Sequence, residues 1–235
     1  MSNFLINPYV FGNGSDIENY VPPTGVPDPS IWYSPRNVTL SGSDVTVIAN
    51  NGTAGSSYDQ TPRTANLATI DSAKSTWNNR DVFNIPNTAS GGYEATGDLT
   101  TTKTVITIAT YFTGAETAFT GYDGLYDKDP GNVGAAAGFV GNGAGGLATT
   151  FTGLPSNAIV DGVAAGDQAT VLPMDKRVVG HVSASNGSFN VIWHDEFSTS
   201  RNWVGFMGDM LVWTTELDAD QIAAVATMLT DYYGT

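Results

Sequence analysis

Two histidines in the last quarter of the chain are the residues whose types could most readily do chemistry. His181 and His194 are the only histidines among the 235 residues, and Asp195 and Glu196 directly follow the second of them. Imidazole nitrogens and carboxylate oxygens are the donors that zinc binds in proteins. The set predicts a metal or ligand site, and the competing interpretation is a polar face of a sheet that only meets solvent.

A loop rich in oxygen donors is the second candidate. Calcium binds carboxylate, amide and carbonyl oxygens, and exposed tyrosines can stack on sugar rings. The residues that would form this calcium or glycan loop are Tyr122, Asp123, Tyr126, Asp127, Asp129 and Asn132. Their spacing fits no EF-hand, and Asp, Asn and Gly also favour turns for conformational reasons, so an ordinary loop is the alternative.

Other motifs match catalytic patterns only superficially. Residues 216–220 resemble the carboxylate series of laminarinase-type glycosidases, but a retaining glycosidase needs carboxyl groups about 5 Å apart in a cleft, and this stretch is expected to join a strand to a helix. Residues 141–146 satisfy G-x-G-x-x-G, but no helix can follow because Pro155 interrupts it. No catalytic set and no cofactor besides calcium is predicted, and we expect the chain not to be an enzyme.

The elements that would position the two histidines are the strands of a predicted hairpin. Residues 177–185 and 188–193 flank Asn186-Gly187, the strongest two-residue turn signal. The register that follows places both histidines on the same, more polar face. They would be diagonal neighbours, roughly 7–8 Å apart.

Several other strands are expected from the alternation of apolar and polar residues. Short strands are predicted over 37–40 and 44–49, and a further one over 77–83. The stretch 104–112 is apolar on both faces and should therefore be central in a sheet.

The strand that ends the sheet is predicted over 205–213. Its apolar residues alternate, with Phe206, Met210 and Val212 on one expected face and Met207, Leu211 and Trp213 on the other.

The period changes after this strand and predicts a C-terminal helix over 218–233. Ile222, Val225, Leu229 and Tyr232 fall on one apolar stripe. Asp218 is expected to cap the helix, with Gln221 completing a capping box, and Gly234 is the stop signal.

This ending resembles that of laminin-G-like or concanavalin-A-like lectin domains of the bacteriophage and microbial type. The matching residues are Gly205, Gly208, Asp209, Trp213, Leu217 and Tyr233-Gly234, with Asp209 and Trp213 standing where the family has Glu and Tyr. Trp32-Tyr33-Ser34, Asn50-Asn51-Gly52 and the strand over 104–112 match more loosely. The resemblance implies an all-β, two-sheet antiparallel jelly-roll sandwich over residues 32–235 that includes the C-terminal helix.

The residues before this domain, 1–31, are predicted to form an extended arm rich in Pro and Gly. The arm is too apolar for a solvated linker, and the residues that we expect to dock on a particle are Phe4, Leu5, Ile6, Tyr9, Phe11 and Tyr20. The alternative is that the arm packs along its own domain.

Composition narrows the class of partner. A net charge of −14 with nine Lys and Arg argues against nucleic acid, and there is no cysteine for a disulfide or thiolate site. We expect no signal peptide and no membrane span, and synthesis in a host cytoplasm.

With the phage-like resemblance, the expected function is a virion surface protein, a capsid decoration or fibre component. Its partners would be capsid or tail proteins, further copies of itself and a cell-surface glycan. A soluble carbohydrate-binding module and a glycosidase are the two alternatives.

Overall fold

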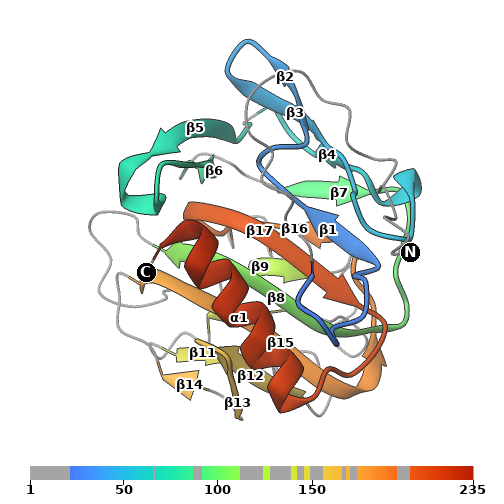
Figure 1. Ribbon diagram of the computed structural model, residues 1–235. Helices are drawn as coiled ribbons and strands as arrows, with labels where there is room; N and C mark the ends of the chain where they lie inside the picture. The colour runs from blue at the N-terminus through green and yellow to red at the C-terminus, as the bar shows by residue number, and fades with distance from the viewer. Residues whose placement is uncertain are drawn as a thin grey trace, which may run out of the picture.

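The computed structural model describes residues 22–65, 67–86, 92–111, 124–127, 139–141, 146–148, 156–165, 168–169, 174–194 and 202–234. Within these ranges the protein is mostly antiparallel β-sheet with one α-helix near the C-terminus (Figure 1). The strands are β1 (Ile31–Tyr33), β2 (Val38–Ser41), β3 (Asp44–Ile48), β4 (Gln60–Pro62), β5 (Thr69–Lys74), β6 (Arg80–Ile85), β7 (Tyr93–Ala95), β8 (Thr102–Tyr111), β9 (Gly124–Asp127), β10 (Phe139–Gly141), β11 (Gly146–Ala148), β12 (Ser156–Val160), β13 (Val163–Ala165), β14 (Gln168–Ala169), β15 (Met174–Gly187), β16 (Val191–Ile192) and β17 (Gly205–Trp213). The helices are α1 (Ala219–Tyr233) and two 3-10 turns, η1 (Ser56–Tyr58) and η2 (Ser75–Trp77).

The longest strands form a central run in the order β12, β15, β8 and β17. β6 and β1 pair with the other edge of β17, β6 at its start and β1 at its end. The predicted strand over 104–112 is confirmed as β8, and nearly all its residues are buried because β15 and β17 flank it. The short strands predicted over 37–40 and 44–49 are confirmed as β2 and β3.

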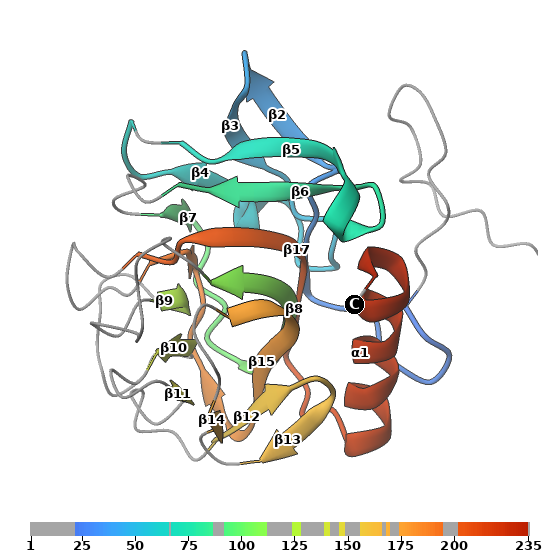
Figure 2. The ribbon, with the colours of Figure 1, turned by 90° about the vertical axis from the view of Figure 1, so that its left-hand side faces the viewer.

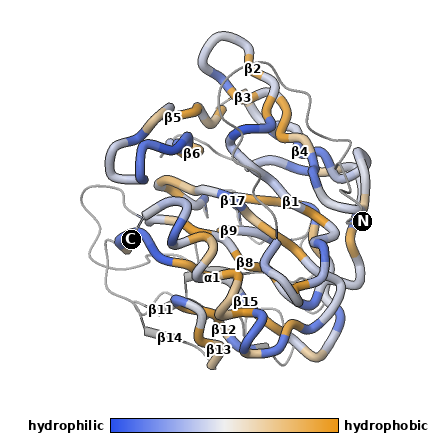
Figure 3. Tube along the Cα trace, viewed as in Figure 1, coloured by the Kyte–Doolittle hydropathy of each residue, from blue (hydrophilic) through white to orange (hydrophobic). Residues whose placement is uncertain are grey.

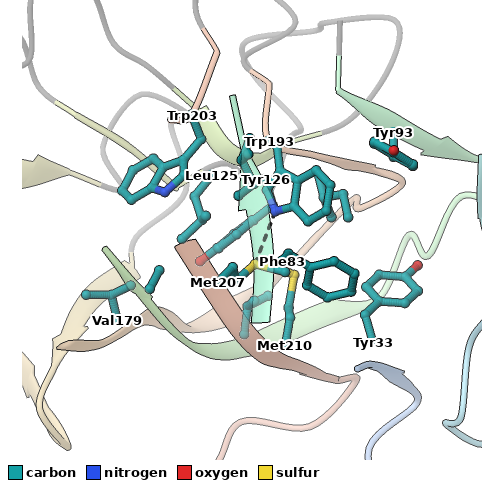
Figure 4. Packing of buried hydrophobic residues seen from close by; sticks show 14 of the residues in the cluster. Tyr33, Phe83, Tyr93, Leu125, Tyr126, Val179, Trp193, Trp203, Met207 and Met210 are labelled. Carbon is teal, nitrogen blue, oxygen red and sulfur yellow. Dashed lines mark hydrogen bonds between the residues drawn. The ribbon is translucent and has the colours of Figure 1, made fainter. Parts of the chain in front are cut away.

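A second run of strands follows the order β2, β3, β4, β7, β16, β9, β10, β11 and β14. The strand pairings β3–β5 and β5–β6 join it to the first run. Side chains from both runs meet in one hydrophobic cluster, in which Trp193 packs edge-on against Phe83 and Tyr93 and its indole N–H lies 3.2 Å from the sulfur of Met207 (Figure 4).

A second cluster lies under α1, on the opposite side of the central run (Figure 2). Figure 3 shows how hydrophobic residues concentrate along the central strands, whereas the β5–β6 connection and the end of α1 are largely hydrophilic. The helix buries Ile222, Val225 and Leu229 as predicted, but Tyr233, not Tyr232, completes the buried stripe. The Asp218–Gln221 capping box is confirmed, and Gly234 follows the last turn with φ of 68°.

The predicted hairpin at Asn186-Gly187 is wrong. β15 runs through both residues to Gly187, and residues 191–192 form β16, which pairs with β7 and β9. The reason is that β15 already has a neighbour on each edge, β8 and β12, over residues 179–182. Neither edge of β15 is left free there to pair with residues 188–193. The hydrogen bonds to two neighbouring strands are therefore formed in place of the hairpin that the local turn signal favours.

The predicted alternation along β17 is also wrong at one end. The register between β17 and β8 shifts between Met207 and Met210, which marks a β-bulge at Gly208 and Asp209. The extra residue reverses which face of the strand each side chain occupies. Met207 therefore joins Met210 and Val212 in the cluster where the two runs of strands meet. Phe206 instead lies on the side of Leu211 and Trp213, against the cluster under α1.

Candidate functional site

The first of the two histidines lies in the core. His181, on β15, is 3 % exposed, and its Nδ1 atom lies 2.7 Å from the hydroxyl of Tyr126 on β9. Burial lowers the pKa of His181 to about 4, and burial raises the pKa of Tyr126 well above its ordinary value. Both groups are therefore neutral at pH 7, and one hydrogen bond joins the tyrosine hydroxyl to Nδ1. This pair is an internal hydrogen bond between the two runs of strands.

The second histidine is also buried and pairs with a residue eight positions later in the chain. His194 is 4 % exposed and forms an isolated bridge with Asn202, whose Oδ1 lies 2.8 Å from His194 Nδ1. Trp203 N–H donates to the carbonyl of Trp193 beside it. Trp193 has φ of 62°, a left-handed conformation that is unusual for a bulky residue and that the surrounding aromatic packing must hold in place.

The structure thus gives the two buried histidines different partners, and the hairpin that would have placed them on one polar face does not form. Among the residues that the structure describes, no three His, Cys, Asp or Glu side chains come together as a metal site. Asp195 and Glu196 lie outside the described residues.

The predicted calcium or glycan loop lies largely outside the described residues, which include Tyr126 and Asp127 but not Tyr122, Asp123, Asp129 or Asn132. Tyr126 is fully buried because its side chain lies in the hydrophobic cluster between the two runs of strands. Its ring packs beside His181 and Phe189 and is not presented to a sugar in this structure. Asp127 is 8 % exposed, and its main-chain carbonyl accepts from Asn190 N–H.

A buried carboxylate sits in the β17 bulge. Asp209 is fully buried, and its Oδ2 accepts from Arg36 Nη2 at 3.0 Å. Arg36 Nε donates to Ser34 Oγ, and its guanidinium lies 4.9 Å from the ring centre of Tyr232 on α1. Burial raises the pKa of Asp209, and Arg36 acts against that shift, as do the polar groups of Ser34, Tyr233 and Trp32 nearby. Asp209 therefore ties β17 to β1 and to the end of α1.

Sequence reasoning missed this cluster, although it carried one signal. A single Asp inside an otherwise apolar strand must find a cation or hydrogen-bond donors, and the preceding Gly208 allows the local crowding. A Cβ at Gly208 would lie 2.6 Å from Tyr233 Cζ. The partner, Arg36, is 173 residues away in the sequence and could not be identified from local pattern.

Asn50, which the family resemblance singled out, organises the first long loop. Its Oδ1 accepts from the main-chain N–H groups of Trp32 and Gly52, and its Nδ2 donates to the carbonyl of Gly55. Asp59 Oδ1 accepts from Asn50 N–H at 2.7 Å. This side chain fixes the loop after β3 against the start of β1, so it has a structural role.

The last part of the predicted arm, residues 22–30, runs beside α1 (Figure 2). We call this segment the strap. Trp213 Nε1 donates to the carbonyl of Pro27 at 2.8 Å, and Gln221 Nε2 donates to the carbonyl of Gly25 at 2.9 Å. Ser30 N–H donates to the carbonyl of Val212, and Val26 packs on the cluster under α1. The strap is therefore attached to both β17 and α1.

The predicted docking residues, Phe4, Leu5, Ile6, Tyr9, Phe11 and Tyr20, all precede the strap and lie outside the described residues. In the carboxylate series at 216–220, Glu216 and Asp220 are exposed and Asp218 is occupied as the helix cap. This arrangement agrees with the expectation that the series joins a strand to a helix.

No helix in the described part of the chain is long and apolar enough to span a membrane. Comparisons of the chain with protein families, with curated proteins and with solved structures find no match.

Proposed function

We propose that this chain is a non-enzymatic structural protein of a bacteriophage virion, a capsid decoration or fibre component, whose N-terminal arm docks on the particle. The observation that carries the proposal is the strap. An arm that holds the domain on a particle must be fixed where it joins the domain. The strap is hydrogen-bonded to β17 through Trp213 and to α1 through Gln221. The apolar residues between Phe4 and Tyr20 lie immediately before this anchored root.

The fold that we propose is a two-sheet jelly roll of the concanavalin-A-like class. Its support is the arrangement of the two runs of strands around a shared aromatic cluster, with α1 on the outer side of the central run. The resemblance at the chain end has a physical counterpart here, because Gly208 makes room for Tyr233 and Asp209 binds Arg36. Trp213, which stands where the family has Tyr, supplies the indole donor that holds the strap.

The buried polar groups support a structural rather than a catalytic role. His181, His194, Asp209 and Asn50 each bind a neighbouring strand or loop, and three of them are less than 5 % exposed. In our proposal these groups stabilise the sandwich, which projects from the particle and meets host glycans through its loops.

The test is sedimentation of native source material on a density gradient, with quantitative mass spectrometry of this chain in each fraction. The proposal expects the chain to travel with multi-megadalton particles at a fixed ratio to a capsid or tail protein. If it stays at the top as a small species, the proposal is wrong, and a glycan-binding screen then tests the soluble carbohydrate-binding module.

Variants of the full chain locate the docking residues. Replacing Phe4, Leu5 and Ile6 together by Ser removes apolar area that docking would bury, so we expect at least a tenfold loss of binding to particles that lack the protein. Replacing Asn3, Asn7 and Asn13 by Ser is the matched control and should leave binding unchanged.

A further inference from the structure

The Asn-Gly step at residues 186–187, which does not form the predicted turn, has a chemistry of its own. In an Asn-Gly step the main-chain nitrogen of the glycine can attack the side-chain amide carbon of the asparagine, because the glycine has no side chain to hinder the approach. The chain contains four such steps, at residues 13–14, 51–52, 142–143 and 186–187. The structure describes the second and the fourth of them, and it places them in different surroundings.

Exposure to solvent does not distinguish these two steps. Asn51 and Asn186 are both exposed. The two steps differ in how the main chain around them is held. This difference matters because the attack requires the asparagine side chain to rotate towards the next residue, whose N–H group must leave its other hydrogen bonds.

The step at Asn51 is held by several contacts. Gly52 N–H donates to Asn50 Oδ1 at 2.8 Å, so the attacking nitrogen is already engaged. Asn51 Oδ1 accepts from Asn37 Nδ2, which fixes the side chain that would have to rotate. The main chain of Gly52 also lies against Ser30, since a Cβ built on this glycine would be 2.3 Å from the Ser30 carbonyl oxygen. Ring closure at Asn51 therefore requires the loop after β3 to open first.

The step at Asn186 lies in an irregular part of β15. The ladder with β8 breaks between Val182 and Gly187, where β15 bulges. On the other edge of β15, the ladder with β12 ends at Ser183. Residues 184–186 therefore have no ladder partner within the part of the chain that the structure describes.

The side chain of Asn186 is also less constrained than that of Asn51. Across the described ranges, no hydrogen bond or ion pair holds the Asn186 side chain. Neither Asn186 nor Gly187 has positive φ, so the step does not adopt the type I′ turn that these residues favour. Gly187 pairs with Thr102 at the end of the β8 ladder, where local opening costs least. The Asn186 amide can therefore rotate towards Gly187 without opening the rest of the fold.

We infer that Asn186 is a site of slow self-modification in the folded protein, by conversion to aspartate and isoaspartate. The Gly187 nitrogen bonds to Cγ of Asn186 and loses its proton to solvent. The bond from Cγ to the side-chain nitrogen breaks, and this nitrogen takes up a proton from solvent and leaves as ammonia. Water then adds to either carbonyl carbon of the cyclic imide and opens it. Opening at one carbonyl gives aspartate and opening at the other gives isoaspartate, in which the main chain passes through Cβ and Cγ.

The modification changes both charge and main-chain length beside the core. Either product adds one negative charge to a chain whose net charge is −14, and isoaspartate also lengthens the main chain by one atom. The residues that follow Gly187 are buried and held by main-chain hydrogen bonds, from Leu99 N–H to the Phe189 carbonyl and from Asn190 N–H to the Asp127 carbonyl. The bulge before Gly187 is therefore the part of β15 that must accommodate the extra atom.

The experiment compares the two Asn-Gly steps within one sample of the full chain. The protein is kept folded in mildly alkaline buffer and, in parallel, unfolded in urea, and conversion at each site is followed by peptide mass spectrometry. Trypsin places the two sites in different peptides because it cleaves after Arg63, between them. In the folded protein, Asn186 should convert at least about tenfold faster than Asn51, since two hydrogen bonds must first break at Asn51. In urea the two rates should become similar.

Single substitutions assign the two rates to the contacts described above. Asn186→Gln should abolish conversion in its peptide, because the longer side chain would have to close a larger ring. Asn37→Ala removes the side-chain hydrogen bond to Asn51 and should speed conversion at Asn51. The rate at Asn186 in that variant is the internal control and should stay unchanged.

Two results would overturn the inference, and neither depends on a variant. One is conversion of Asn51 in the folded protein as fast as that of Asn186. The other is an unmodified Asn186 in the folded protein over the time in which the chain in urea converts it. Both are measured on the isolated chain, so they leave the proposed function to its own test.

Discussion

A neutral histidine buried against a tyrosine should make this protein sensitive to acid. The pKa of His181 is about 4 in the folded state, against an ordinary value of 6.5. Between these values the unfolded chain binds a proton that the folded chain does not, so stability is complete above pH 6.5 and is lost as the pH falls towards 4. We expect this group alone to remove about 2–3 kcal/mol of unfolding free energy between pH 7 and pH 4.5.

Urea denaturation across this pH range checks the prediction. His181→Gln can still accept a hydrogen bond from Tyr126 but does not titrate, and its stability should fall less on acidification than that of the parent protein. Equal pH dependence of the two proteins would show that His181 is not the group responsible.

The Arg36–Asp209 pair predicts an asymmetry between its two partners. Asp209 is fully buried whereas the Arg36 side chain is 24 % exposed, so the guanidinium can turn to water and the carboxylate cannot. Arg36→Met should therefore cost about 3–5 kcal/mol by leaving a buried charge uncompensated, and Asp209→Asn should cost less. The double variant should cost less than the sum of the two.

Equilibrium unfolding of the four proteins measures these differences. Equal losses for the two single variants, added together in the double variant, would mean that the ion pair has no coupling of its own. That result would contradict the role given to Asp209 as the link between β17, β1 and α1.

At the scale of elements, the β17 bulge and the last turn of α1 fit together through Gly208. A Cβ there would meet Tyr233 Cζ at 2.6 Å and Ile108 Cγ2 at 2.7 Å. Tyr233 cannot retreat easily, because it is buried and packs edge-on against Trp77. Gly208→Ala should therefore destabilise the fold by about 1–3 kcal/mol and loosen the end of α1.

Hydrogen exchange of residues 228–233 measures this loosening directly. Thr227→Ala, on the exposed side of the same helix, is the control, and we expect it to change stability by less than about 0.5 kcal/mol. Unaltered exchange in Gly208→Ala would mean that the bulge and the helix move independently.

The elements that could be predicted are those whose signals are local. The helix over 218–233 has its cap, its apolar stripe and its stop within one short stretch, and β8 is apolar on both faces. The hairpin at Asn186-Gly187 failed because its turn signal says nothing about which strands already flank β15. The bulge at Gly208 and Asp209 was missed because strict alternation assumes an unbroken ladder.

At the scale of the whole molecule, the contacts that matter most join distant parts of the sequence. Arg36 meets Asp209, Trp213 meets Pro27, and β1 pairs with β17. An Asp in an apolar strand of the sequence indicates that the buried carboxylate needs a cation. Which of the nine Lys and Arg becomes its partner depends on the folded topology. The shared face predicted for the two histidines was wrong for the same reason, because it was derived from a hairpin that the topology excludes.

The strap also has a consequence for how this protein can change over evolutionary time. Trp213 and Gln221 bind the carbonyl oxygens of Pro27 and Gly25, atoms that every amino acid provides, whereas Val26 and the buried Pro29 contribute side chains. These two hydrogen bonds therefore depend on the path of the main chain and not on which side chains it carries. A different segment could be joined ahead of residue 22 without loss of these hydrogen bonds, which makes this junction a suitable place for recombination.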